Sequence, residues 1–131
     1  MFVDASVLCA LMAREPDFDA LSSRLEAATD RITSPMAVWE AAISLARIMN
    51  IGPEAALEGV RQLLSKAEIA VVPIPPEAGA LAVEAYARFG KGRHKAALNF
   101  GDCFAYACAR HYGVKLLYKG DDFALTDIEP A

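Results

Sequence analysis

The sequence predicts an α/β sandwich around a short, mostly parallel sheet, with residues 1–131 in a single domain. Three observations support this prediction. Apolar segments with helical spacing alternate with short extended segments, turn residues separate them, and no repeat, low-complexity tract or linker divides the chain. In such folds ligands gather at the carboxyl ends of the strands. Functional side chains are therefore expected at that edge of the sheet.

The expected elements begin with a strand over 1–4 and a helix over 5–13, with an acid at the turn between them. After Pro16, Asp17 is a candidate cap for a second helix, whose apolar face is Phe18, Leu21 and Leu25. Ser34 followed by Pro35 is typical of an N-cap and first helical position. We further expect strands at 31–33, 69–74 (buried) and 115–118, and helices at 36–49, 53–66, from Pro75 and Pro76 to about 89, and 101–112.

The composition is that of an ordinary soluble globular protein, with 55% hydrophobic and 23% charged residues. No segment approaches the roughly 20 apolar residues of a membrane span. The first residues also lack the pattern of a signal peptide, because Asp4 interrupts them. We therefore expect a cytoplasmic protein that does not enter a membrane. The three cysteines have no CxxC spacing and are expected to be buried thiols rather than zinc ligands.

A net charge of −4 taken alone argues against a nucleic-acid binder. Acids concentrated around a bound cation would reverse this local sign, however, and basic residues elsewhere can hold a phosphate backbone. The densest positive charge lies in 88–95, where Lys91, Arg93 and His94 are candidate substrate-binding residues, and the intervening glycines would let a backbone approach closely. The alternative is a solvated loop whose charges only aid solubility.

Five acids are candidates for a catalytic site. Asp4 follows the first strand, and Asp121 and Asp122 follow the last, so these side chains can point into one crevice. Glu40 lies one turn into a helix, and Asp102 lies in the first turn of another. Each could instead be a cap or turn residue. Glu40 is harder to explain in that way, because its neighbours are apolar and a carboxylate beside a core is costly without partners.

Magnesium is the metal that such a set of carboxylates would bind, since it takes oxygen ligands and keeps several waters. Zinc is disfavoured by the absence of suitably spaced His and Cys. Two polar residues are candidate substrate contacts: Ser6 could place a hydroxyl at the site, and Asn99 an amide. For both, capping of the adjacent helix is the favoured interpretation.

Four segments together resemble PIN-domain toxins of the VapC type. They are residues 3–6 (VDAS), 34–40 (SPMAVWE), 98–106 (LNFGDCFAY) and 119–123 (KGDDF), in this order along essentially the whole chain. The resemblance implies a PIN-like three-layer α/β/α sandwich, metal-dependent endoribonuclease activity, a homodimer, and neutralisation by a small VapB-type antitoxin. Asp4, Glu40 and Asp102 match the family's acidic positions, whereas Asp121 and Asp122 are rival matches for the fourth acid.

The resulting hypothesis is that Asp4, Asp102 and one of Asp121 and Asp122 hold Mg²⁺, with Mn²⁺ as a possible substitute. Glu40 would orient or deprotonate the attacking water, and RNA would be cut to 5′-phosphate and 3′-hydroxyl ends. Surplus apolar surface on the helices over 18–25 and 53–66 would form a groove for an antitoxin helix. One alternative is a catalytically inactive PIN-like module that binds RNA or protein. A receiver domain is another, but its five regular strand-helix repeats are absent from the sequence.

Overall fold

The computed structural model describes residues 1–131, and its centre is a parallel four-stranded sheet. The strands are very short and follow the order β3-β2-β1-β4. In the central pairings, Phe2 lies opposite Ile32 on one side and Leu116 on the other. The bounds are β1 (Phe2–Val3), β2 (Ile32–Thr33), β3 (Ala70–Val71) and β4 (Leu116–Leu117).

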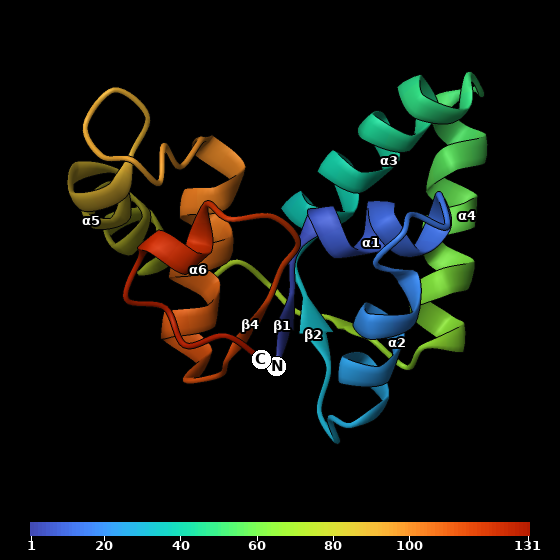
Figure 1. The fold of residues 1–131 in the computed structure, drawn as a ribbon, viewed down its shortest axis with the longest axis horizontal. Helices are drawn as coiled ribbons and strands as arrows, with labels where there is room; N and C mark the ends of the chain where they lie inside the picture. Colours follow the sequence, from blue (N-terminus) through green and yellow to red (C-terminus); the bar gives the residue numbers. More distant parts are fainter.

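Helices cover both faces of the sheet, which makes three layers (Figure 1). On one face lie α1 (Ala5–Met12), α2 (Phe18–Glu26), α3 (Pro35–Met49) and α4 (Pro53–Lys66), and on the other lie α5 (Ala78–Phe89) and α6 (Phe100–Tyr112). A short 3₁₀ helix, η1 (Phe123–Leu125), follows β4. The predicted α/β/α sandwich is confirmed, and the sheet is parallel throughout. No helix is long and apolar enough to cross a membrane.

Alternate side chains of β1 and β4 pack into two separate cores. Phe2 and Leu116 pack into the core under α5 and α6, whereas Val3 and Leu117 pack into the core under α1 to α4. This follows from the period of two residues in a strand, which sends neighbouring side chains to opposite faces. Both of these strands are therefore fully apolar, as expected for strands of a parallel sheet covered on both faces.

The helix ends largely follow the predicted signals. The Ser34 hydroxyl accepts a hydrogen bond from the Ala37 amide at 3.2 Å, and Pro35 occupies the first turn of α3. Asp17 occupies the predicted N-cap position of α2, but its side chain makes no capping hydrogen bond. Its carboxylate instead lies 3.8 Å from the Lys119 Nζ. Leu21 and Leu25 are buried in the core, so they add no surplus apolar surface.

The expectation of a buried strand over 69–74 is also wrong. The strand contains only Ala70 and Val71, both exposed, and Val71 keeps 49% of its surface accessible. The physical reason is that β3 is an edge strand that pairs only with β2, so a β-branched composition does not imply coverage on both faces. All three cysteines are free thiols, and Cys103 and Cys108 are buried as predicted.

Candidate active site

Asp4 lies where β1 ends and α1 begins, and its backbone amide donates to Leu117 O at 3.0 Å, which aligns it with the end of β4. It is the N-cap of α1: Oδ2 accepts hydrogen bonds from the Ser6 amide at 2.9 Å and the Ser6 hydroxyl at 2.5 Å. The residue is only 5% exposed. Burial raises the pKa of Asp4 even though both hydrogen bonds oppose the shift.

Ser6 links this acid to the chain after the last strand. Its hydroxyl donates to Asp4 and accepts from the Lys119 amide at 3.1 Å. The expectation that Ser6 caps the helix is therefore wrong, because Asp4 takes that position. Lys119 in turn forms an ion pair with Glu15, in the turn after α1. Sequence analysis missed Lys119 as a structural residue, since nothing local connects residues more than 100 positions apart.

Glu40 on α3 and Asp102 on α6 approach each other above the end of β1. Burial raises the pKa of Glu40 to about 7, with further contributions from the charges of Asp4 and Asp102. Acids from the beginning, the middle and the end of the chain are thus electrostatically coupled. At neutral pH, proton transfer to and from Glu40 requires little free energy.

Asp102 also belongs to a capping box at the start of α6. Its amide donates to Asn99 Oδ1 at 3.0 Å, and its Oδ2 accepts from the Asn99 amide at 2.8 Å. Capping by Asn99, the favoured interpretation, is confirmed. Burial raises the pKa of Asp102 to about 6, the bond from Asn99 opposes this, and the charges of Asp4 and Asp122 add to it. Because the box uses Oδ2, Oδ1 remains for a metal or substrate.

Asp121 and Asp122 are both exposed on the loop between β4 and η1. Asp122 is close enough for its charge to raise the pKa of Asp102, whereas Asp121 does not contribute to the shift of any of the other three acids. Asp122 is therefore electrostatically coupled to Asp102, which is coupled to Asp4 and Glu40, whereas Asp121 shows no such coupling.

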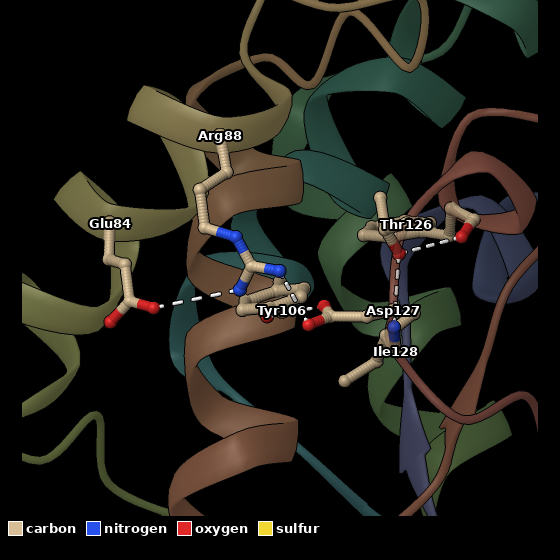
Figure 2. Close-up of polar contacts among 7 residues, drawn as sticks. Glu84, Arg88, Tyr106, Thr126, Asp127 and Ile128 are labelled. Atoms are coloured by element: carbon tan, nitrogen blue, oxygen red, sulfur yellow. Dashed lines mark hydrogen bonds and ion pairs between the residues drawn. The ribbon is translucent and has the colours of Figure 1, made fainter.

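A polar network holds the chain that follows Asp122 against α5 and α6 (Figure 2). The Tyr106 hydroxyl donates to Asp127 Oδ1 and the Arg88 Nη2 to Asp127 Oδ2, both at 2.7 Å. Arg88 Nη1 also lies 3.6 Å from Glu84 Oε1. The hydrogen bond from Tyr106, followed by the contacts of Arg88, lowers the pKa of Asp127. No sequence motif predicts this network, because its members come from three separate segments of the chain.

The basic loop over residues 90–99 leads directly into α6. Leu98 N donates to Phe89 O at 3.0 Å, which closes the loop. Lys91, Arg93 and His94 are all exposed, but the Arg93 guanidinium lies 5.4 Å from the centre of the Tyr86 ring, and His94 Nδ1 accepts from the Ala96 amide at 3.1 Å. No hydrogen bond or ion pair joins the three side chains to the acids.

The glycines of this loop also meet local structural requirements. A β-carbon on Gly90 would overlap the side chain and carbonyl of Tyr86, and Gly92 has a φ of +80°, which disfavours other residues. A β-carbon on Gly92 would have nothing within 4 Å. That these glycines let a phosphate backbone approach the loop stays a prediction.

The acids fit a hard divalent cation by their chemistry. They offer carboxylate oxygens only, and no Lys or Arg forms an ion pair with any of them. Burial and the charges of Asp4 and Glu40 raise the pKa of the neighbouring Cys9 thiol to about 11, which keeps it protonated and unsuited to bind metal. No three His, Cys, Asp or Glu side chains are arranged as a complete metal site. Such a loose set suits Mg²⁺, which is commonly held by a few carboxylates and several waters.

Comparisons with known proteins identify the family to which the chain belongs. The model of the PIN domain family matches residues 1–129. A VapC ribonuclease of Rhizobium meliloti is 39% identical, over 97% of this chain and 98% of its own length. Ribonuclease VapC30 of Mycobacterium tuberculosis is 37% identical, over 98% of this chain and 95% of its own. Among solved structures, VapC20 of the same species, described as a toxin that cleaves the sarcin-ricin loop, has a TM-score of 0.76 at 20% identity, covering 99% and 97% of the two chains.

Proposed function

Because the chain belongs to the PIN domain family, and within it is similar over its whole length to VapC ribonucleases, we propose that it is a magnesium-dependent endoribonuclease. The names of its relatives support cleavage of RNA. The metal-dependent mechanism is supported mainly by the electrostatic coupling of Asp4, Glu40 and Asp102. These three acids have raised pKa values and no basic partner in the protein.

Asp4, Asp102 and Asp122 would hold the ion, directly or through water. Bound Mg²⁺ supplies electrophilic stabilisation of charge that builds on the phosphoryl oxygens. Glu40, with a pKa of about 7, accepts a proton from the attacking water. The water oxygen bonds to phosphorus while the bond to the 3′ oxygen breaks, which leaves a 5′-phosphate and a 3′-hydroxyl. The ribose 2′-hydroxyl takes no part in this chemistry, so a preference for RNA must come from recognition.

The basic loop would hold the phosphate backbone on the α6 side of the site. Lys91 and Arg93 are exposed, and the loop leads without interruption to the helix that carries Asp102. The side-chain oxygens of Ser6 and Asn99 are engaged within the protein, so the alternative of a substrate contact is not favoured for either residue. His94 remains a candidate contact through Nε2.

A VapB-type antitoxin would bind a groove on the other side of the molecule. A cavity of about 790 Å³ between α1, α2 and α4 is lined by apolar and charged side chains of both signs. Met12, Phe18 and Leu63 supply apolar lining, and Arg14 and Lys66 supply positive charge. This composition suits an amphipathic helix, whose apolar face would enter the groove.

A second copy of the chain would cover the apolar surface formed by α5 and the start of α6. Val83 is 69% exposed and Phe100 70%, and a cavity of about 310 Å³ lies between them, beside Tyr86 and Phe104. Light scattering should show a dimer, and Val83→Glu should shift it toward monomer, because a buried unpaired charge is costly at an interface.

The deciding experiment incubates mixed structured RNA with the purified protein in Mg²⁺ or Mn²⁺, and then in EDTA. We expect cleavage only with metal, and its loss in Asp4→Ala and Asp102→Ala. An inactive binding module, the competing function, would retain RNA without cutting it. Cleavage that survives EDTA or both substitutions would rule out the mechanism.

The neighbouring pair of aspartates provides a matched test of the fourth acid. Asp122→Ala should reduce the rate about 10-fold or more, because a misplaced or weakened metal affects the transition state directly. Asp121→Ala, one residue away and equally exposed, should stay within about 2-fold of wild type. Equal losses in the two variants would contradict the assignment to Asp122.

A further inference from the structure

Gly101 lies in the first turn of α6, directly against the carboxylate of Glu40 on α3. It is buried, and a β-carbon built on it would overlap Glu40 Oε1, Cδ and Oε2, which are the three atoms nearest to it. The glutamate carboxylate thus rests on the bare backbone of α6, next to the residue that carries the Asp102 carboxylate.

Backbone conformation does not explain this glycine. Gly101 has no positive φ, unlike Gly92, Gly113 and Gly120. Within a helix, alanine is intrinsically more stable than glycine, so a glycine here needs another reason. Space is that reason, and the contact is specific: a β-carbon on Gly79 of α5 would have nothing within 4 Å, and one on Gly59 of α4 would meet only the terminal methyl of Met12.

We propose that Gly101 is a positioning residue that sets the separation between the carboxylates of Glu40 and Asp102. The expected effect on catalysis rests on the proposed nuclease function. The expected displacement of Glu40 rests on contact geometry alone. Any side chain at this position pushes Glu40 away from α6. Asp102 does not follow, because its capping box with Asn99 holds it to α6.

The catalytic consequence follows from the precision that such a site requires. A displacement of about 1 Å in a reacting group can reduce the rate on the order of 100-fold. The added methyl group forces a movement of at least that order, since it would occupy the space of the carboxylate itself. The effect should fall on kcat more than on KM for RNA or on the affinity for divalent metal, because the basic loop and the aspartates that would hold the ion are not displaced.

The first arm of the test measures function in Gly101→Ala. We expect kcat to fall about 10- to 100-fold, whereas Mn²⁺ affinity, measured by electron paramagnetic resonance, should stay near the wild-type value. Gly52→Ala, at the N-cap of α4, is the control and should leave both unchanged, because a β-carbon there would make only an ordinary contact with Glu54. In the shorter-side-chain E40D background, the same G101A substitution should cost less than about 3-fold, because aspartate leaves room for the methyl group.

The second arm measures thermal unfolding and needs no enzymatic activity. The change in Tm caused by G101A should be less favourable when Glu40 is present than in the E40A background, where the overlap is removed and only the higher helix propensity of alanine remains. An equal change of Tm in both backgrounds, or a wild-type kcat in G101A, would overturn the inference. Absence of RNA cleavage by the wild-type protein would refute the proposed function instead, and the unfolding cycle would still decide whether Gly101 positions Glu40.

Discussion

Helix α6 contacts two groups of carboxylates that have opposite environments. Asp127 receives hydrogen bonds from Tyr106 and Arg88, and its pKa is lowered. Asp102, one turn from Tyr106 on the same helix, is coupled to Asp4 and Asp122, and its pKa is raised to about 6. The first group is neutralised by side chains of the protein and stabilises the fold. The second group places several negative charges near one another without a basic partner. This arrangement lowers the stability of the fold, as is expected of a site selected for function.

The largest effect is expected when a charge is removed from the second group, the acids around Asp102. Activity should fall while the stability of the metal-free protein rises. Glu40→Gln keeps the shape of the side chain, and we expect cleavage to fall about 100- to 10,000-fold because the proton acceptor is lost. Unfolding of the metal-free protein should occur at a higher temperature, because a raised pKa marks unfavourable charge. Glu84→Gln, on the exposed side of the paired group, is the control and should change neither measurement appreciably. If the Tm of metal-free Glu40→Gln were lower than that of the wild type, repulsion among the acids would not be destabilising the fold.

The link between Asp4 and the final loop should matter less, but measurably. Ser6→Ala removes both the donor to Asp4 and the acceptor for the Lys119 amide, and we expect about a 10-fold lower kcat together with about 1 kcal/mol less stability. Ser6→Thr keeps the hydroxyl and should recover most of the rate. If threonine fails to rescue while alanine is tolerated, the hydroxyl is not the group that matters.

The two groups should also give the metal-free protein opposite dependences on pH. The folded-state pKa values of Glu40 and Asp102 are raised, to about 7 and about 6, so their favourable contribution is complete below about pH 4 and is lost as pH rises through those values. Asp127 has a lowered pKa, so its contribution is present above its ordinary pKa near 4 and is lost on acidification. In EDTA, the Tm should therefore fall by a few degrees between about pH 5 and 8.

Two additions sharpen this measurement. Saturating Mg²⁺ should flatten or reverse the slope, because a cation that binds the ionised acids stabilises the folded state. Glu40→Gln should also reduce the slope in EDTA. A Tm that rises steadily from pH 5 to 8 without metal would contradict the raised pKa values.

The smallest effect is expected in the paired group. Tyr106→Phe removes one hydrogen bond to Asp127, which should cost about 1 kcal/mol and a few degrees of Tm. Cleavage should stay within about 2-fold of wild type, because Asp127 lies outside the coupled acids. A large loss of activity would mean that the chain after Asp122 depends on this anchor to place that residue.

Much of this organisation could be predicted from the sequence. The caps at Ser34 and Asn99 and the helices of the chain follow from local rules, and the three-layer fold follows from the alternation of elements. Two differences, the exposure of Val71 and the approach of Asp17 to Lys119, depend on which distant segment lies alongside. The capping of α1 by Asp4 rather than Ser6 is a local contact between residues two positions apart, where the sequence offers two neighbouring cap candidates.

For this protein the sequence by itself determined the order of helices and strands, the resemblance to a family, and the acids worth testing, because periodicity, caps and motifs are local properties. Only the tertiary structure decided that Asp122 rather than Asp121 joins the coupled acids, that Ser6 binds the Lys119 amide, and that Gly101 leaves room for Glu40. Those features depend on contacts between segments far apart in the chain, and a contact of that kind exists only once the two cores have packed against the sheet.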